Sequence, residues 1–543
     1  MRPSYWSAAL LVAVFACAHS TDPVAPPSAA CEMDRPPILP IAAGESWRLS
    51  GDDPVCVSLE SGAEYLLTVA NIGSGTNESI VEPVVRIDLT NASPSSNANA
   101  NTNANLTGAA SGGRWLEHHA AVGLLEQARR AKSQRPTTVI TLSRSDIQAT
   151  LGTAQVGDRV WIPDRWSTNA CGADPGAIPV FGAVVVAVSG SSVILADSRL
   201  PNLADITAPT ERSRLHQIAA TIEKGYLPTM RILIASDFAP PNGANGRIFT
   251  LLSNLTFDLG TTILPNEASP RSFCAGSIEA SIAVLPGTAS VAEATMAGTA
   301  IHEHAHGADF WRGPALSGMW LGSRAWGTEA LATNAQEQAA RIVANTPTAY
   351  RQFIETSEVQ SHWPATRWPA TSRPEFSPLW GNHAARLAAY GTGGLFLLFA
   401  REQRNEVWTD AGSGPRLYEQ LAASGDWSLA GFAALLGSTP EDLFDRFVLA
   451  VALDDRMAPP IASDSRLPQF TTWDNSWRRD LTEDPSWRAF EMEILGAFPE
   501  TQLSVGAGTY GMWRVHGDNG GVKVKLTPIA GRPASIVRIT RYR

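Results

Sequence analysis

The sequence predicts a multidomain α+β protein in which a central domain, built from a mixed sheet and buried helices, is flanked by small β-sandwich or β-barrel modules. The chain has 543 residues, which is too long for one domain. Its 44% hydrophobic and 17% charged residues are typical of a folded globular chain. Short β patterns occupy both ends, whereas helical patterns dominate the middle.

Residues 1–17 have the pattern of an export signal. Arg2 precedes an apolar run from Tyr5 to Ala16, which is too short to span a membrane. The stretch that ends at Cys17 resembles a bacterial lipobox, in which the cysteine is lipidated, and it also matches an ordinary cleavage site. We therefore expect an exported protein, either a lipoprotein on the cell surface or outer membrane or a freely secreted protein.

The other four cysteines are consistent with export, because an even number in an oxidising compartment favours disulfides. Cys31 and Cys56 lie in the same N-terminal region, so we expect them to pair. A bond between Cys171 and Cys274 would then join a β module to the central domain. Four buried thiols are the alternative. No CxxC motif occurs, so a cysteine zinc site is not expected.

Polar linkers and β modules alternate in the first part of the chain. Residues 18–37, rich in Pro, Ala and Ser, are typical of a tether, and 38–92 have the short β runs of a small sandwich. The Asn-rich and Ala-rich segment 93–113 has nothing to bury and is expected to be a disordered linker. Segment 114–205 is expected to contain a helix over 114–133 and then a second β module.

Residues 206–460 have a mixed pattern that is mostly helical in its later part. Segments 231–235 and 247–252 are predicted to be strands. Ser438–Glu441 has the form of a capping box with Pro near the first turn, which predicts that a helix starts there. Residues 461–543 return to alternating apolar and polar positions, so we expect a C-terminal β module.

The strongest functional signal in the chain is the sequence His-Glu-His-Ala-His at 302–306, an H-E-x-x-H motif. On the helix predicted over 291–310, His302 and His306 lie one turn apart on one face, so both imidazoles can reach the same metal ion. Glu303 projects beside them, where its carboxylate can take a proton from water held by the metal.

A catalytic zinc site needs a third protein ligand and leaves one position open. Glu329 is the predicted third ligand, because it falls in the first turn of the next predicted helix and would face back towards the metal. Gly327 or Thr328 is expected to cap that helix. Glu337, further along the same helix, is the alternative; we expect it to support a ligand or form a salt bridge instead.

The two ligand segments resemble the gluzincin metallopeptidases, in which H-E-x-x-H is completed by a downstream Glu, often in a W-x-x-E-G-x-A context. Trp326, Glu329 and Ala332 match that context, and Ala330 stands in place of the usual Gly. Within this group the chain resembles the hyicolysin-like secreted bacterial peptidases.

Three further segments carry the resemblance to the hyicolysin-like enzymes across roughly 205–455. Residues 242–248 resemble a turn that precedes a strand in those enzymes, although the aspartates of that turn are missing and no cation site is expected. Residues 390–396 resemble their Y-G-x-x-x-L-F helix, and 444–453 resemble their closing helix.

The resemblance implies a zincin-like catalytic domain over 206–460. It also implies that His302, His306 and Glu329 hold Zn²⁺, and that Glu303 is the general base.

Peptide hydrolysis also needs a donor to the developing oxyanion. His383 and Tyr390 lie two turns apart on one predicted helix face, and either residue is a candidate donor; a core histidine or a structural hydroxyl is the alternative. Thr333 stands where other gluzincins place an Asp that orients a histidine, so no such partner is assigned. His304 is expected to be a polar residue that faces away from the metal.

These patterns predict an exported zinc metalloendopeptidase that acts on a protein or peptide substrate. Two alternatives stay open: a catalytically inactive cell-surface binding protein on a peptidase fold, or a zinc hydrolase of peptidoglycan or lipid. The intact Glu303 argues against an inactive protein. The net charge of −10 argues against nucleic acid as a partner. Membrane contact is expected only through a lipid anchor at Cys17.

Overall fold

The structure is a computed structural model that describes a large part of the chain. Several segments discussed above lie outside the described residues, including the export segment 1–17, the tether 18–37, the linker 93–113 and the helix expected over 114–133. The described residues are 45–49, 55–60, 62–71, 83–90, 140–164, 176–254, 262–263, 265–272, 274–287, 291–312, 325–354, 383–404, 406, 415–424, 426–453, 500–504, 509–516, 522–528 and 535–541.

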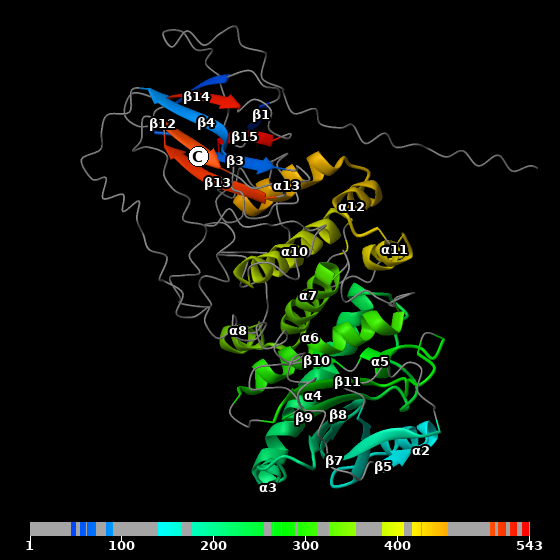
Figure 1. Ribbon diagram of the computed structural model, residues 1–543. Helices are drawn as coiled ribbons and strands as arrows, with labels where there is room; N and C mark the ends of the chain where they lie inside the picture. Colours follow the sequence, from blue (N-terminus) through cyan, green and yellow to red (C-terminus); the bar gives the residue numbers. More distant parts are fainter. Residues whose placement is uncertain are drawn as a thin grey trace, which may run out of the picture.

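A mixed seven-stranded sheet forms one end of the molecule, and helices are layered above it (Figure 1). Strands β8, β9 and β11 are parallel to one another, and the other strands pair antiparallel. The chain is therefore α+β with a mixed sheet, as predicted. The strand order is β10 (Thr262–Ile263), β11 (Ser281–Pro286), β9 (Ile248–Ser253), β8 (Ser192–Asp197), β7 (Ile178–Ser189) and β5 (Ile140–Leu142), and β6 (Arg159–Pro163) also pairs with β7.

Strand β9 shows why the sheet is buried on both faces. All six of its residues are buried. Phe249 and Leu251 pack in a cluster with helix α2 (Arg144–Gly152), whereas Ile248 and Leu252 pack with the large helical layer on the other face. Successive side chains of a strand point to opposite faces, so a nearly continuous apolar run is expected in such a position.

The shared sheet differs from the predicted division between 114–205 and 206–460. Strands β5 to β8 come from the first segment and β9 to β11 from the second, yet β8 and β9 pair directly. The turn before β9 strengthens this connection, because Asn245 donates to the carbonyl of Gly152 (3.1 Å) and Arg247 to that of Ala154 (2.7 Å). A strand pattern predicts a strand but not which strand pairs with it.

The strand predicted at 231–235 is wrong: residues 231–233 form the end of helix α4 (Pro209–Leu233). A short apolar run does not distinguish a strand from a buried helical turn, and the longer pattern decides it. By contrast, the strand predicted at 247–252 is confirmed as β9. The buried residues of α4 recur every three or four positions: Leu215, Ile218, Ala219, Ile222, Tyr226, Met230 and Leu233.

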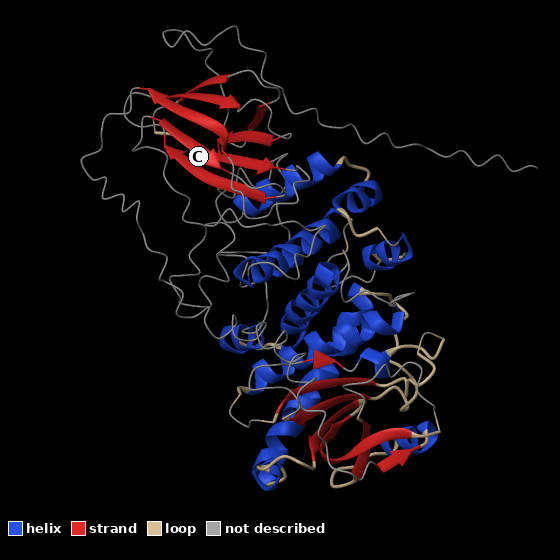
Figure 2. Ribbon diagram, viewed as in Figure 1, coloured by secondary structure: helices blue, strands red, loops and turns tan. Residues whose placement is uncertain are grey.

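Helices are stacked between the mixed sheet and the opposite end of the molecule (Figure 2). Two short helices, α3 (Leu203–Ile206) and α5 (Pro265–Ala268), lie near the sheet. The main stack comprises α6 (Glu293–Arg312), α7 (Ala325–Val343), α8 (Pro347–Ile354), α10 (His383–Gln403), α11 (Leu417–Ser424), α12 (Leu429–Leu436) and α13 (Pro440–Leu453). The predicted start of α13 is confirmed, but the capping residue is Thr439 rather than Ser438, because the Asp442 N–H donates to Thr439 Oγ1 (3.1 Å).

Helix α6 is buried over most of its length because it lies between β11, α4, α7 and α8. Its neighbours approach closely at small residues. A Cβ atom at Gly298 would lie 2.1 Å from the carbonyl oxygen of Phe353 on α8, so only glycine allows this approach. A helix buried on all faces is expected in the core of a large domain, where its polar side chains need specific partners.

Both ends of the chain contribute to two four-stranded antiparallel sheets, which we call the terminal β region. Strand β3 (Glu64–Asn71) lies between β13 (Thr509–His516) and β15 (Ser535–Arg541). This pairing differs from the prediction of separate modules at 38–92 and 461–543. The remaining strands are β1 (Ser46–Leu49), β2 (Val55–Leu59), β4 (Pro83–Thr90), β12 (Glu500–Ser504) and β14 (Val522–Pro528).

A buried ion pair connects the terminal β region to helix α13. Arg538 of β15 donates from Nε to Asp445 Oδ2 (3.1 Å), and both side chains are buried. Arg538 also donates to Ser46 Oγ (2.5 Å), so strands from both ends of the chain meet at this contact. Breaking such a pair by removing one partner typically costs about 3–5 kcal/mol.

Cys274 is buried and forms a disulfide, in agreement with the expectation for exported cysteines. Its predicted partner, Cys171, lies outside the described residues, as does Cys31, so the predicted pairings stay predictions. Among the helices that the structure describes, none combines the length and apolar character needed to cross a membrane.

Candidate metal centre

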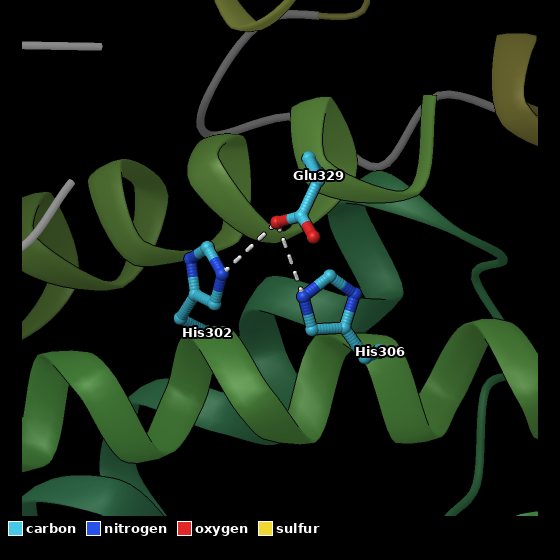
Figure 3. Close-up of side chains that lie close together, drawn as sticks. All are labelled: His302, His306 and Glu329. Carbon is cyan, nitrogen blue, oxygen red and sulfur yellow. Dashed lines mark ion pairs between the residues drawn. The ribbon is translucent and has the colours of Figure 1, made fainter. Parts of the chain in front are cut away.

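Two neighbouring helices bring three potential ligand atoms together (Figure 3). Helix α6 supplies His302 and His306, one turn apart, and the first part of α7 supplies Glu329. Glu329 Oε2 lies 3.5 Å from His302 Nε2 and 3.4 Å from His306 Nε2. One ligand atom from each residue lies within 4.8 Å of the others, and these residues form the one such group in the described part of the chain. They could hold a metal ion.

The spacing of these atoms fits metal ligands better than a direct ion pair. A charge-assisted N–H···O hydrogen bond has a length of about 2.7–2.9 Å. In a tetrahedral site with metal–ligand bonds of about 2.0–2.1 Å, two ligand atoms lie about 3.4 Å apart. The two Nε2–Oε2 distances of 3.5 and 3.4 Å match the second geometry. The residues present therefore fit a shared metal ion.

The electrostatics of the group favour an ionised carboxylate. Burial alone would raise the pKa of Glu329, but the neighbouring imidazoles outweigh burial and hold that pKa well below its usual range. Burial alone would lower the pKa of His306, but the Glu329 carboxylate outweighs it and raises that pKa. A metal site requires its carboxylate ligand to be deprotonated, and Glu329 is in that state.

Glu303 is a second carboxylate at the same site and is only 6% exposed. After burial and Glu329, its charge also contributes to the raised pKa of His306, which places it close to the ligand group. It is not one of the three grouped ligands. The sequence prediction of a base beside the ligands is consistent with this position.

His304 faces the sheet, away from the ligand group, as predicted. It is fully buried, and its Nδ1 lies 2.8 Å from Ser281 Oγ on β11. Its Nε2 lies 3.3 Å from Thr250 Oγ1 on β9, and the Tyr226 ring lies 5.5 Å away between centroids. Burial lowers the pKa of His304 to about 3, so the imidazole is neutral. His304 therefore attaches α6 to the sheet.

Glu337, the alternative third ligand, lies outside the group. It accepts a hydrogen bond from the Tyr350 hydroxyl, and its Oε1 lies 3.9 Å from Arg341 Nη2. Its role in a salt bridge agrees with the expectation for this residue. Glu329 is the carboxylate that the fold brings to the histidines.

His383 and Tyr390, the predicted oxyanion donors, both lie in helix α10, which confirms that they share a helix. Their side chains are outside the described part of the structure, so their role stays a prediction. Thr333 is fully buried in α7.

Sequence reasoning missed a contact between α6 and the start of α7. Asp309, one turn after His306, accepts a hydrogen bond from Thr328 Oγ1 (3.2 Å), the residue immediately before Glu329. Thr328 was expected to cap α7, but the helix starts earlier, at Ala325. A signal was present in the sequence, because Asp309 places a carboxylate between the apolar residues Ala308 and Phe310.

Comparison of the chain with models of known protein families and with curated proteins finds no match.

Proposed function

We propose that the chain is an exported zinc metalloendopeptidase of the gluzincin type, with a zincin-like catalytic domain. His302, His306 and Glu329 would hold Zn²⁺, and Glu303 would be the general base. The observation that carries this proposal is the position of Glu329 Oε2, which lies 3.5 Å from His302 Nε2 and 3.4 Å from His306 Nε2, beside a further buried carboxylate.

The donor set supports zinc in particular. Two His and one Glu are the ligands of one class of catalytic zinc sites, and three protein ligands leave a fourth position open. Structural zinc sites are usually closed by four protein ligands, mostly Cys and His. When bound, zinc lowers the pKa of water to about 7 and polarises a carbonyl oxygen.

Glu303 then supplies the proton transfers of hydrolysis. Its carboxylate takes a proton from the water that attacks the peptide carbonyl carbon. When the C–N bond breaks, the same carboxyl group delivers that proton to the leaving amine nitrogen. Water is thereby divided between a new carboxyl group and a new amine. His383 or Tyr390 would donate to the oxyanion, as the sequence predicts.

Metal content and casein hydrolysis of the exported chain, measured for the wild type and Glu303→Gln, test the proposal. We expect one equivalent of zinc in both proteins. General-base catalysis contributes about 10²- to 10⁴-fold, so hydrolysis should fall by that amount in the variant.

A wild type without bound metal, or a variant as active as the wild type, would contradict the proposal. Zinc binding without hydrolysis of casein would direct the next assay to peptidoglycan and lipid substrates. Zinc binding without hydrolysis of any of these would favour a binding protein.

A further inference from the structure

The turn of α7 at residues 327–329, which carries Glu329, is held by contacts on two sides. On one side, the Thr328 hydroxyl donates to Asp309 on α6 (3.2 Å). On the other side, the buried Trp427 ring packs against Gly327. A Cβ atom at that position would lie 2.4 Å from the ring carbon Cε3, so a larger residue would displace the ring or the helix.

Asp309 is placed to fix the position of α7 relative to α6. Its side chain is 1% exposed, and a buried carboxylate is costly unless it accepts hydrogen bonds. Asp309 follows His306 by one helical turn, and Thr328 directly precedes Glu329. The hydrogen bond therefore joins a residue close to His306 with a residue next to Glu329. A slide or rotation of α7 that moved Glu329 away from His306 would stretch this hydrogen bond.

We propose that Asp309 and Thr328 are positioning residues that set the distance between Glu329 and the two histidines, with Trp427 holding the outer side of the same turn. This inference rests on the proposed metal site. Metal ligands need their geometry fixed by surrounding side chains, and loss of such a partner typically lowers metal affinity about 10- to 100-fold.

The test uses Thr328→Val, which removes the hydroxyl at nearly constant volume, and Thr328→Ser, which keeps it. Zinc affinity of the exported chain is measured by competition with a chelating indicator, and the visible absorption of the Co²⁺-loaded protein reports ligand geometry. We expect Thr328→Val to bind Zn²⁺ about 10-fold more weakly or worse and to change the Co²⁺ spectrum, whereas Thr328→Ser stays close to the wild type.

Thr295→Val is the matched control. Thr295 is a buried threonine on α6, and its hydroxyl donates to the Gln352 carbonyl (2.9 Å), which connects α6 to α8 rather than to Glu329. We expect this variant to lower Tm to a similar extent as Thr328→Val and to leave zinc affinity and the Co²⁺ spectrum unchanged.

A double-mutant cycle with Asp309→Ala checks that the two residues act together. We expect the losses of zinc affinity to be non-additive, because either change removes the same hydrogen bond. Unchanged zinc affinity and an unchanged Co²⁺ spectrum in Thr328→Val would overturn the inference and leave the proposed function intact. A wild type that binds no zinc would instead overturn the proposed function.

Discussion

On helix α6, His304 and His306 lie two positions apart and are both buried, yet their pKa values move in opposite directions. Burial lowers the pKa of His304 to about 3, and its ring nitrogens lie beside the uncharged hydroxyls of Ser281 and Thr250. Burial also acts on His306, but the Glu329 carboxylate, 3.4 Å away, outweighs it and raises the pKa. We call the side of α6 with His302 and His306 the ligand face, and the side with His304 the sheet face. Both faces are buried, so the carboxylate of Glu329 is what distinguishes them.

The comparison also explains how one helix can serve two purposes. Neighbouring positions on a helix point in different directions, so the motif separates its middle histidine from the outer two. His304 fixes the rotation of α6 on strands β9 and β11. His302 and His306 are thereby directed at α7.

Removing the Glu329 carboxylate should remove the interaction that raises the pKa of His306 and sets it apart from His304. This substitution has the largest effect that we expect. Glu329→Gln deletes a ligand charge, so zinc affinity should fall by more than about 100-fold, beyond the range for supporting residues, and hydrolysis should be lost. Chelator competition measures the affinity. Glu337→Gln is the control, since Glu337 lies on the same helix but accepts a hydrogen bond from Tyr350 and is not part of the ligand group. Equal zinc affinity in Glu329→Gln and the wild type would refute the assignment.

Lowering the pH should destabilise the folded protein through protonation of His304 on the sheet face. Its folded-state pKa of about 3 lies below the unfolded value of 6.5, so the unfolded chain binds the proton more readily. The stability that the neutral ring contributes is fully present above pH 6.5 and is lost as the pH falls towards 3. The slope from this one group is about 1.4 kcal/mol per pH unit within that window.

Urea unfolding of metal-free protein at pH 6.5 and 4.5 measures this loss, with His304→Gln as the reference that cannot titrate. We expect the wild type to lose about 2–3 kcal/mol more than the variant between these pH values. The same pH dependence in both proteins would show that His304 is not the responsible group.

Single hydroxyl deletions should weaken the sheet face least. Ser281→Ala removes the shorter contact to His304, of 2.8 Å, and Thr250→Val the longer one, of 3.3 Å. We expect losses of about 1–3 kcal/mol for the first and about 0.5–1.5 kcal/mol for the second, with zinc stoichiometry unchanged in both. Urea midpoints rank the two variants. The reverse order, or a loss of zinc, would mean that the two faces are not independent.

The ligand group could be predicted from the sequence because its geometry is mostly local. Helical spacing places His302 and His306 on one face, and a Glu near the start of the next helix is a short-range pattern. The contact between Asp309 and Thr328 could not be predicted in the same way. It depends on how closely α6 approaches α7, and Trp427, from a distant part of the chain, helps to set that approach.

Strand pairing was the least predictable part of the fold. The sequence predicted a strand at 247–252 and, from alternating apolar and polar positions, a C-terminal β module, and both regions contain strands. The sequence pattern of a strand does not indicate which other strand it pairs with. For this reason β8 and β9 were assigned to different modules, although they pair. At 231–235 a short apolar run was misread as a strand, because the helical period becomes visible only over the whole of α4.

The interleaving of strand β3 between β13 and β15 has a consequence for biogenesis. During synthesis, β3 emerges first, and both of its neighbours follow only after the whole helical domain. The sheets of the terminal β region therefore cannot be completed before the last strands have been synthesised. Until the last strands are made and Arg538 reaches Asp445, the early strands carry open edges, so this part of the fold is completed last.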